Sequence, residues 1–292
     1  MTILKNAKHP TVISRLTSAL LLLGLAAPGW AYEDATVVNG GRVTGRVILT
    51  GAPPPARIYH LVFSPNPDFC GKISDGRGNR LLKEFSVSDD GGLQSAVVAV
   101  VGVPKGKPFT YAQKIDIENC RLTPFVMPVR HLQPIEIVNH DGISHDLQAY
   151  TLKDNYTFAM FNKPMAPKSE AVKTVVFRPD NYIFRTQCGV HDFMQSWGMA
   201  VGNPYFAVTG PDGRFTIPDL PPGDYDIIAW HPRLRVQAGH ISVPPNGEAV
   251  IDFRFNAADV HIPEHDLQAG YRLQTALAPL HLAPPSIELQ TP

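Results

Sequence analysis

Short apolar segments separated by turn residues recur along most of the chain. Residues 37–49 are rich in valine and other β-branched residues, and Gly51 and a run of three prolines follow them. A second apolar segment, residues 96–101, follows soon after a turn of two aspartates and two glycines. Such segments predict β-strands, and no stretch of ten or more residues shows a convincing helical period. The pattern therefore predicts an all-β fold.

The spacing of the later segments predicts two sandwiches. Seven short strands are expected in the middle of the chain, at residues 115–117, 125–129, 135–138, 146–150, 174–177, 182–187 and 199–201. Five more are expected after Asn203, at residues 205–209, 215–217, 225–230, 239–243 and 249–255. Strands this short and this closely spaced favour a β-sandwich followed by a smaller one. Residues 257–292 carry prolines and scattered leucines without a period, and we expect an extended or partly disordered tail.

The first 31 residues have the character of a secretory signal peptide. Lys5, Lys8 and Arg15 precede a short apolar run, residues 20–27, and small residues lead up to Ala31. We predict cleavage after Ala31 and a periplasmic or secreted protein. The apolar run is shorter than the ~20 residues that a spanning helix needs, so we expect no membrane span after cleavage. An uncleaved anchor is the alternative.

Composition narrows the function classes. The chain has 26 Lys+Arg against 26 Asp+Glu, 18% charged residues, 23 Gly and 28 Pro. These values exclude a coiled coil, a basic nucleic-acid binder and an acidic disordered chain. We therefore expect no nucleic-acid partner. Motifs of common hydrolases, nucleotide-binding proteins and haem proteins are also missing from the sequence, so an enzyme is not expected.

Sulfur and imidazole side chains cluster at Cys188, His191 and Met194. A loop that bends back on itself can bring the three to one metal ion, and the preceding strand predicts that Cys188 points inward. His145 supplies a fourth donor, since it follows a strand and a turn. One thiolate, two imidazoles and a thioether form the ligand set of a blue-copper centre, whereas structural zinc favours more thiolates.

Two further residues compete for roles near this site. Met199 is an alternative axial ligand, although it is expected in the strand that follows the Cys188–Met194 loop. His140 is expected to be a turn residue. A metal-free fold with the same residues is the remaining alternative.

Residues 114–203 resemble the cupredoxins, particularly amicyanin and plastocyanin. The resemblance rests on the segment from Cys120 to Val129, on Ile-Glu-Ile-Val-Asn-His-Asp from Ile135, on the aromatic strand before Cys188, and on Cys-x-x-His-x-x-Met. It implies a Greek-key β-sandwich that holds one type 1 copper ion. The ligands carried over are His145, Cys188, His191 and Met194.

Three neighbouring residues would surround these ligands. The resemblance places Asn139 before the first ligand loop, while Asp146 and Asp192 stand where the family usually has Asn and often has Pro. A carboxylate beside the metal would favour the more positive Cu(II) state, and we expect a lowered redox potential.

The resemblance also implies a function, which is electron transfer by cycling of copper between Cu(II) and Cu(I). In related folds the second loop histidine reaches the surface through an apolar patch, so His191 with Phe193 and Trp197 is the expected docking surface. The partner would be a c-type cytochrome or a periplasmic oxidoreductase. The alternative is a copper-binding or cell-envelope accessory protein without a redox role.

The remaining cysteines, Cys70 and Cys120, are then predicted to form a disulfide. That both are free, or that one pairs with Cys188, stays open. Residues 204–256 resemble the carboxypeptidase regulatory-like module, a transthyretin-like β-sandwich without catalytic activity. Residues 32–113 are expected to be an N-terminal β region that packs on the other domains, and residues 41–49 resemble the opening strand of such modules.

Overall fold

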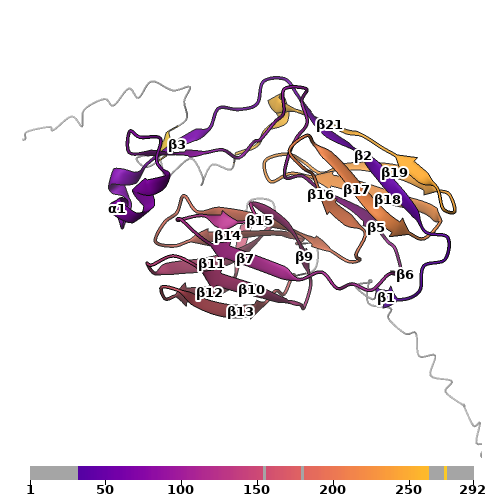
Figure 1. Ribbon diagram of the computed structural model, residues 1–292, viewed down its shortest axis with the longest axis horizontal. Helices are drawn as coiled ribbons and strands as arrows, with labels where there is room; N and C mark the ends of the chain where they lie inside the picture. Colours follow the sequence, from indigo (N-terminus) through magenta and orange to yellow (C-terminus); the bar gives the residue numbers. More distant parts are fainter. Residues whose placement is uncertain (1–31, 154–155, 179–180, 263–272, 275–292) are drawn as a thin grey trace, which may run out of the picture.

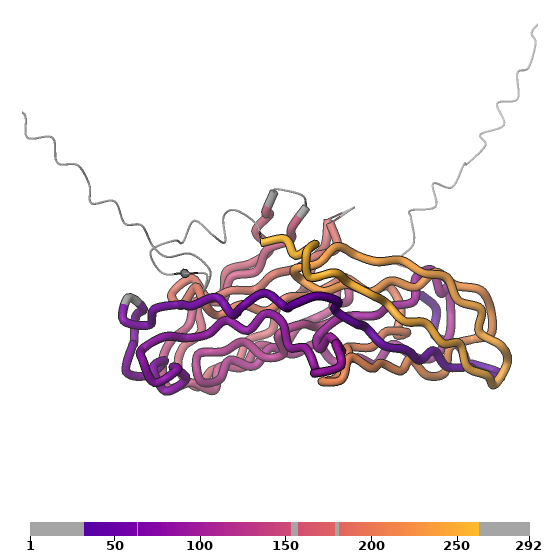
Figure 2. Tube along the Cα trace, turned by 90° about the horizontal axis from the view of Figure 1, so that it is seen from above, coloured from indigo at the N-terminus to yellow at the C-terminus, as the bar shows by residue number. Residues whose placement is uncertain are grey.

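In the computed structural model, the described residues are 32–153, 156–178, 181–262 and 273–274. The predicted signal peptide lies outside them, as does most of the predicted tail. The described chain is built mainly of β-strands in several sheets, which confirms the all-β prediction. Figures 1 and 2 show an elongated molecule in which two sandwiches lie end to end. Within the described residues, no helix is long and apolar enough to cross a membrane.

The first sandwich contains two facing sheets. The larger has the order β12 (Tyr156–Met165), β11 (His145–Lys153), β14 (Ile183–Cys188), β15 (Gln195–Val201) and β9 (Val126–Arg130). The smaller has the order β13 (Ser169–Thr174), β10 (Pro134–Asn139), β7 (Gln113–Ile117) and β8 (Leu122–Thr123). Alternate residues such as Ile115, Ile135 and Leu147 point into one apolar core between the sheets.

The second sandwich includes strands from both ends of the chain. One sheet has the order β16 (Phe206–Val208), β5 (Val97–Val101), β18 (Gly223–Trp230) and β19 (Gln237–Val243). The other has the order β17 (Arg214–Leu220), β2 (Gly41–Thr50) and β20 (Glu248–Val250), with β21 (Phe253–Asn256) also paired to β2. Both β2 and β5, which complete these sheets, come from residues 32–113.

Between β2 and β5, residues 57–82 of the N-terminal region cover one end of the first sandwich. They contain β3 (Arg57–His60), η1 (Leu61–Phe63), α1 (Pro67–Cys70), η2 (Gly71–Ile73) and β4 (Asn79–Leu82). We call residues 57–82 the flap. The predicted disulfide is present and joins Cys70 at the end of α1 to Cys120 in the first sandwich. Tyr59, Leu61 and Cys70 are buried in the core of the first sandwich, so the flap is packed against it as well as bonded to it.

The two sandwiches share an apolar contact. Val97 and Trp230 of the second sandwich lie in one buried cluster with Val126, Trp197 and Met199 of the first. This cluster holds the two sandwiches together, because separating them would expose its apolar surface to water.

Candidate metal centre

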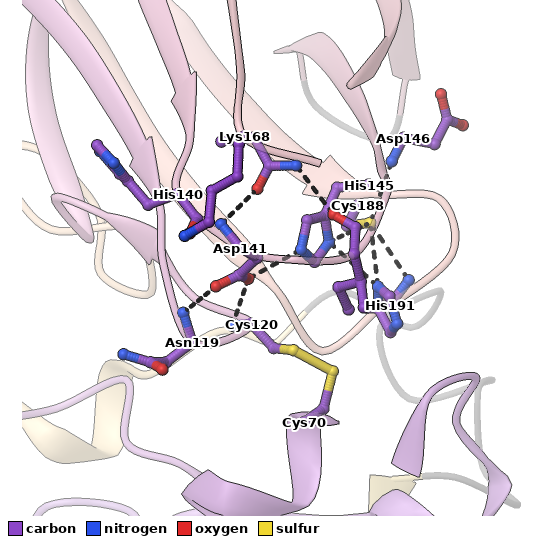
Figure 3. A network of polar contacts seen from close by, with 12 residues as sticks. Cys70, Asn119, Cys120, His140, Asp141, His145, Asp146, Lys168, Cys188 and His191 are labelled. Atoms are coloured by element: carbon purple, nitrogen blue, oxygen red, sulfur yellow. Dashed lines mark hydrogen bonds and ion pairs between the residues drawn. A yellow bond between two sulfur atoms is a disulfide. The ribbon is translucent and has the colours of Figure 1, made fainter. Parts of the chain in front are cut away.

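Three potential metal ligands meet at one end of the first sandwich (Figure 3). His145 begins β11, Cys188 ends β14, and His191 lies in the loop between β14 and β15. The antiparallel pairing of β11 with β14 places Leu147 opposite Cys188, so residues more than forty positions apart come together at one strand end. The structure therefore brings together three of the four ligands predicted from the sequence.

The spacing of the donor atoms suits a bound transition-metal ion. His145 Nδ1 and His191 Nδ1 are 3.2 Å apart, and Cys188 Sγ lies 3.7 Å from each of them. With metal–nitrogen bonds near 2.05 Å and a metal–sulfur bond near 2.3 Å, angles of 110–120° require about 3.4–3.6 Å between the nitrogens and about 3.6–3.8 Å from nitrogen to sulfur. The residues present fit a metal ion with little movement.

Hydrogen bonds fix the tautomer of both imidazoles. His145 Nε2 lies 2.9 Å from Asp141 Oδ2, and His191 Nε2 lies 3.1 Å from the carbonyl oxygen of Pro65. A carbonyl oxygen only accepts, so His191 must carry its proton on Nε2, and the carboxylate has the same effect on His145. Each Nδ1 lone pair is therefore left to face the sulfur, as a metal ligand requires.

The electrostatics of the cluster favour neutral imidazoles. Burial lowers the pKa of His145, partly opposed by Asp141. Burial and then the neighbouring His145 lower the pKa of His191. At neutral pH both rings are therefore uncharged and able to bind a cation through nitrogen.

Cys188 is held as a buried, hydrogen-bonded sulfur. Burial raises the pKa of its thiol, while backbone N–H groups oppose that change. The N–H groups of Asp146 and His191 each donate to Sγ at 3.4 Å. Such donors orient the sulfur and stabilise the thiolate that a metal would bind.

Met194 closes the ligand loop. Its N–H donates to the His191 carbonyl at 2.9 Å, and its own carbonyl accepts from Cys188 N–H at 3.2 Å. Met194 is buried in the same apolar cluster as Cys188. Met199, the rival axial ligand, lies in the cluster between the two sandwiches. This placement favours Met194.

The three residues predicted to surround the ligands have separate structural roles. Asn139 accepts from Asp141 N–H and donates to the carbonyls of Ile143 and Ala166, which fixes the turn before His145. Asp146 accepts from Gln148, and its other carboxylate oxygen is buried with no partner among the described residues.

Asp192 and His140 each have a hydrogen-bond partner outside the donor cluster. Asp192 accepts from the Tyr59 hydroxyl of the flap at 2.7 Å. His140 lies on the surface, with Nε2 2.7 Å from Asp116, consistent with a turn residue.

The predicted docking surface is wrong, because both of its residues are buried. Phe193 is 3% exposed and Trp197 is 2% exposed. The flap covers Phe193 with the Tyr59 ring, at a centroid distance of 4.9 Å. The second sandwich covers Trp197, which lies in the shared cluster. His191 is also fully buried, so the ligand that the resemblance placed at the surface lies beneath the flap.

Two residues that complete the site were missed by the sequence analysis. Asp141 contacts His145 and also accepts from the N–H groups of Asn119 and Cys120, as Figure 3 shows. Pro65 lies 126 positions before His191 in the sequence. Asp141 could have been noticed four residues before a ligand histidine, whereas Pro65 depends on how the flap folds. Cys120 also lies near Asp141 and His145, but its sulfur is in the disulfide and is not a metal donor.

Comparison with known proteins gives matches only among solved structures. No family model and no curated protein matches the chain. A purple cupredoxin from Nitrosopumilus maritimus is 12% identical, with 30% of this chain and 99% of that chain covered and a TM-score of 0.26. Amicyanin from Paracoccus versutus is 16% identical, with 32% and 84% covered and a TM-score of 0.26.

A copper-containing nitrite reductase from Thermus scotoductus is 14% identical, with 35% and 25% covered and a TM-score of 0.26. The solved structures named here are two cupredoxins and a copper enzyme, and likenesses of this size establish no family. They cover about a third of the chain, and the resemblance of residues 204–256 to the carboxypeptidase regulatory-like module stays a prediction.

Proposed function

We propose that the protein is a periplasmic or secreted electron carrier, not an enzyme, with one type 1 copper ion held by His145, Cys188, His191 and Met194. The observation that carries the proposal is the convergence of two Nδ1 atoms and one thiol sulfur within 3.2–3.7 Å. Two imidazoles and a thiolate with a weak thioether are the donor set of blue-copper centres. When bound, copper would supply a one-electron Cu(II)/Cu(I) couple.

The residues of this chain hold the donor set rigid. Asp141 and the Pro65 carbonyl fix the two rings from their far sides, and two backbone N–H groups fix the sulfur. All four proposed ligands are buried, which keeps bulk water from the donors. A site that changes little between oxidation states requires little reorganisation, which suits outer-sphere transfer.

The buried position of His191 sets the route to a partner. Its Nε2–H donates to the Pro65 carbonyl, and Pro65 itself is exposed on the flap. A c-type cytochrome or a periplasmic oxidoreductase would therefore dock on the flap around Pro65, in place of the Phe193 and Trp197 surface.

Colour tests the redox proposal. Copper-loaded protein is expected to absorb intensely in the visible range and to be bleached reversibly by ascorbate, and Cys188→Ala is expected to abolish the colour. Met194→Leu is expected to raise the midpoint potential while keeping the site, whereas Met199→Leu is the matched control that leaves the potential unchanged. A colourless loaded protein, or a colour that survives Cys188→Ala, contradicts the proposal.

A second candidate function is a non-redox copper-binding or cell-envelope accessory protein. The complete burial of His191 beneath the flap favours this second function, because shielding of a metal ligand slows electron exchange with a partner protein. Binding of copper without the intense colour would select this candidate.

A further inference from the structure

A cavity lies between the flap and the loop that carries Met194. Its volume is about 640 Å³, within the range of small-molecule sites. The flap contributes Arg80 and Leu82, the first sandwich contributes Arg121 and Leu122, and the ligand loop contributes Phe193 and Met194. The cavity therefore borders the metal centre without including its imidazole or thiol donors.

The acidic groups of this cavity are already occupied. Glu84 pairs with Arg57 at 2.9 Å and also with Arg233. Asp75 accepts from Arg77 N–H and from two nitrogens of Asn79, at 2.8–3.1 Å. Neither carboxylate therefore forms an ion pair with the other cations of the cavity wall, Arg80, Lys83 and Arg121.

Three cations of the wall are left without an acidic partner. Within the part of the chain that the structure describes, Arg80, Lys83 and Arg121 form no ion pair. The wall holds four cations, which are these three and Arg57, against the two carboxylates of Asp75 and Glu84, so the cavity carries an excess of positive charge.

Arg80 is the cation most in need of a partner. Its Nε and Nη1 atoms are buried and have no hydrogen-bond partner among the described residues. Its guanidinium carbon lies 5.1 Å from the centroid of the Phe193 ring, which holds the side chain against the cavity wall. Burial, and then the nearby Arg121, lower the pKa of Arg80 to about 10. The group is still charged at neutral pH, and leaving its buried N–H donors unmatched costs free energy.

We propose that this cavity binds a small oxyanion, a carboxylate or a phosphate, on the guanidinium of Arg80. A guanidinium presents paired N–H donors that match two oxygens of such an anion. Arg121 and Lys83 add positive charge at the wall, while Leu82, Leu122 and Phe125 line it with apolar surface. The site does not depend on a metal ion, so it stands apart from the redox function.

Calorimetric titration of the full chain tests the site, with inorganic phosphate and benzoate as separate probes at ionic strength held constant with chloride. At least one probe is expected to bind. Arg80→Gln is expected to weaken that binding at least tenfold. Arg77→Gln, which removes an exposed arginine of the same flap, is the matched control and is expected to bind like the unaltered chain.

Arg80→Lys and Arg121→Gln complete the test. Lys keeps the charge but not the paired donors, and an intermediate loss is expected. Arg121→Gln changes an exposed residue and is also expected to weaken binding. It replaces Arg80→Gln as the test if circular dichroism shows that Arg80→Gln does not fold. The proposal is overturned if neither probe binds the unaltered chain, or if folded Arg80→Gln binds as tightly as Arg77→Gln.

Discussion

Removing the disulfide is the most informative perturbation of the flap. The change is Cys70→Ala together with Cys120→Ala, which releases the flap from the first sandwich. Both cysteines are buried, and alanine introduces no polar group that would need a partner. The variant therefore isolates the effect of the covalent link.

The magnitude follows from the length of chain that the link closes. The two cysteines are 50 positions apart. Closing a loop of this length lowers the entropy of the unfolded chain, which raises its free energy by about 4 kcal/mol at 25 °C. Tyr59 and Leu61 still anchor the flap in the core, and Tyr59 still donates to Asp192. We therefore expect a folded variant whose free energy of unfolding is lower by about 4 kcal/mol.

Urea unfolding followed by tryptophan fluorescence measures this loss, because Trp197 and Trp230 are both buried between the sandwiches. The unaltered chain treated with dithiothreitol is the control, and it should unfold like the variant. Thiol counting should give one free thiol, Cys188, in the denatured unaltered protein and one in the variant. A decrease in the free energy of unfolding of less than about 1 kcal/mol would refute the view that the disulfide stabilises the protein by restricting its unfolded chain.

Two further predictions concern single side chains. Asp141→Asn should lower metal affinity about 10–100-fold in a competition titration, because the amide no longer fixes the His145 tautomer. Asp116→Asn, at an exposed ion pair, should leave the affinity unchanged. Burial lowers the pKa of His231 to about 3, so the unfolded chain takes up a proton below about pH 6.5 that the folded chain does not. Stability should fall by a few kcal/mol from pH 6.5 to pH 3, and His231→Asn should flatten that slope in urea unfolding while exposed His240→Asn should not. An unchanged slope in His231→Asn would contradict the assignment.

The strands were predictable where burial leaves a pattern in the sequence. Residues 182–187 and 135–138 correspond to β14 and β10, whose inward residues are mostly apolar. The strand expected at residues 174–177 is absent, and β13 (Ser169–Thr174) pairs with β10 instead. That edge strand alternates between partly buried and exposed residues, so it has no buried apolar face by which the sequence could reveal it.

The sequence by itself determined the chemistry of the candidate site. Cys188, His191 and Met194 lie within seven residues, and strand alternation directs the cysteine inward, so the sequence indicated these three donors, while the pairing of β11 with β14 brought His145 to them. The tertiary structure alone decided what surrounds that loop. It placed β2 and β5 inside the second sandwich, and it laid Pro65 over His191 across 126 positions of sequence. Such contacts depend on how distant segments pack, because the residues next to a position in the sequence do not indicate which remote segment will cover it.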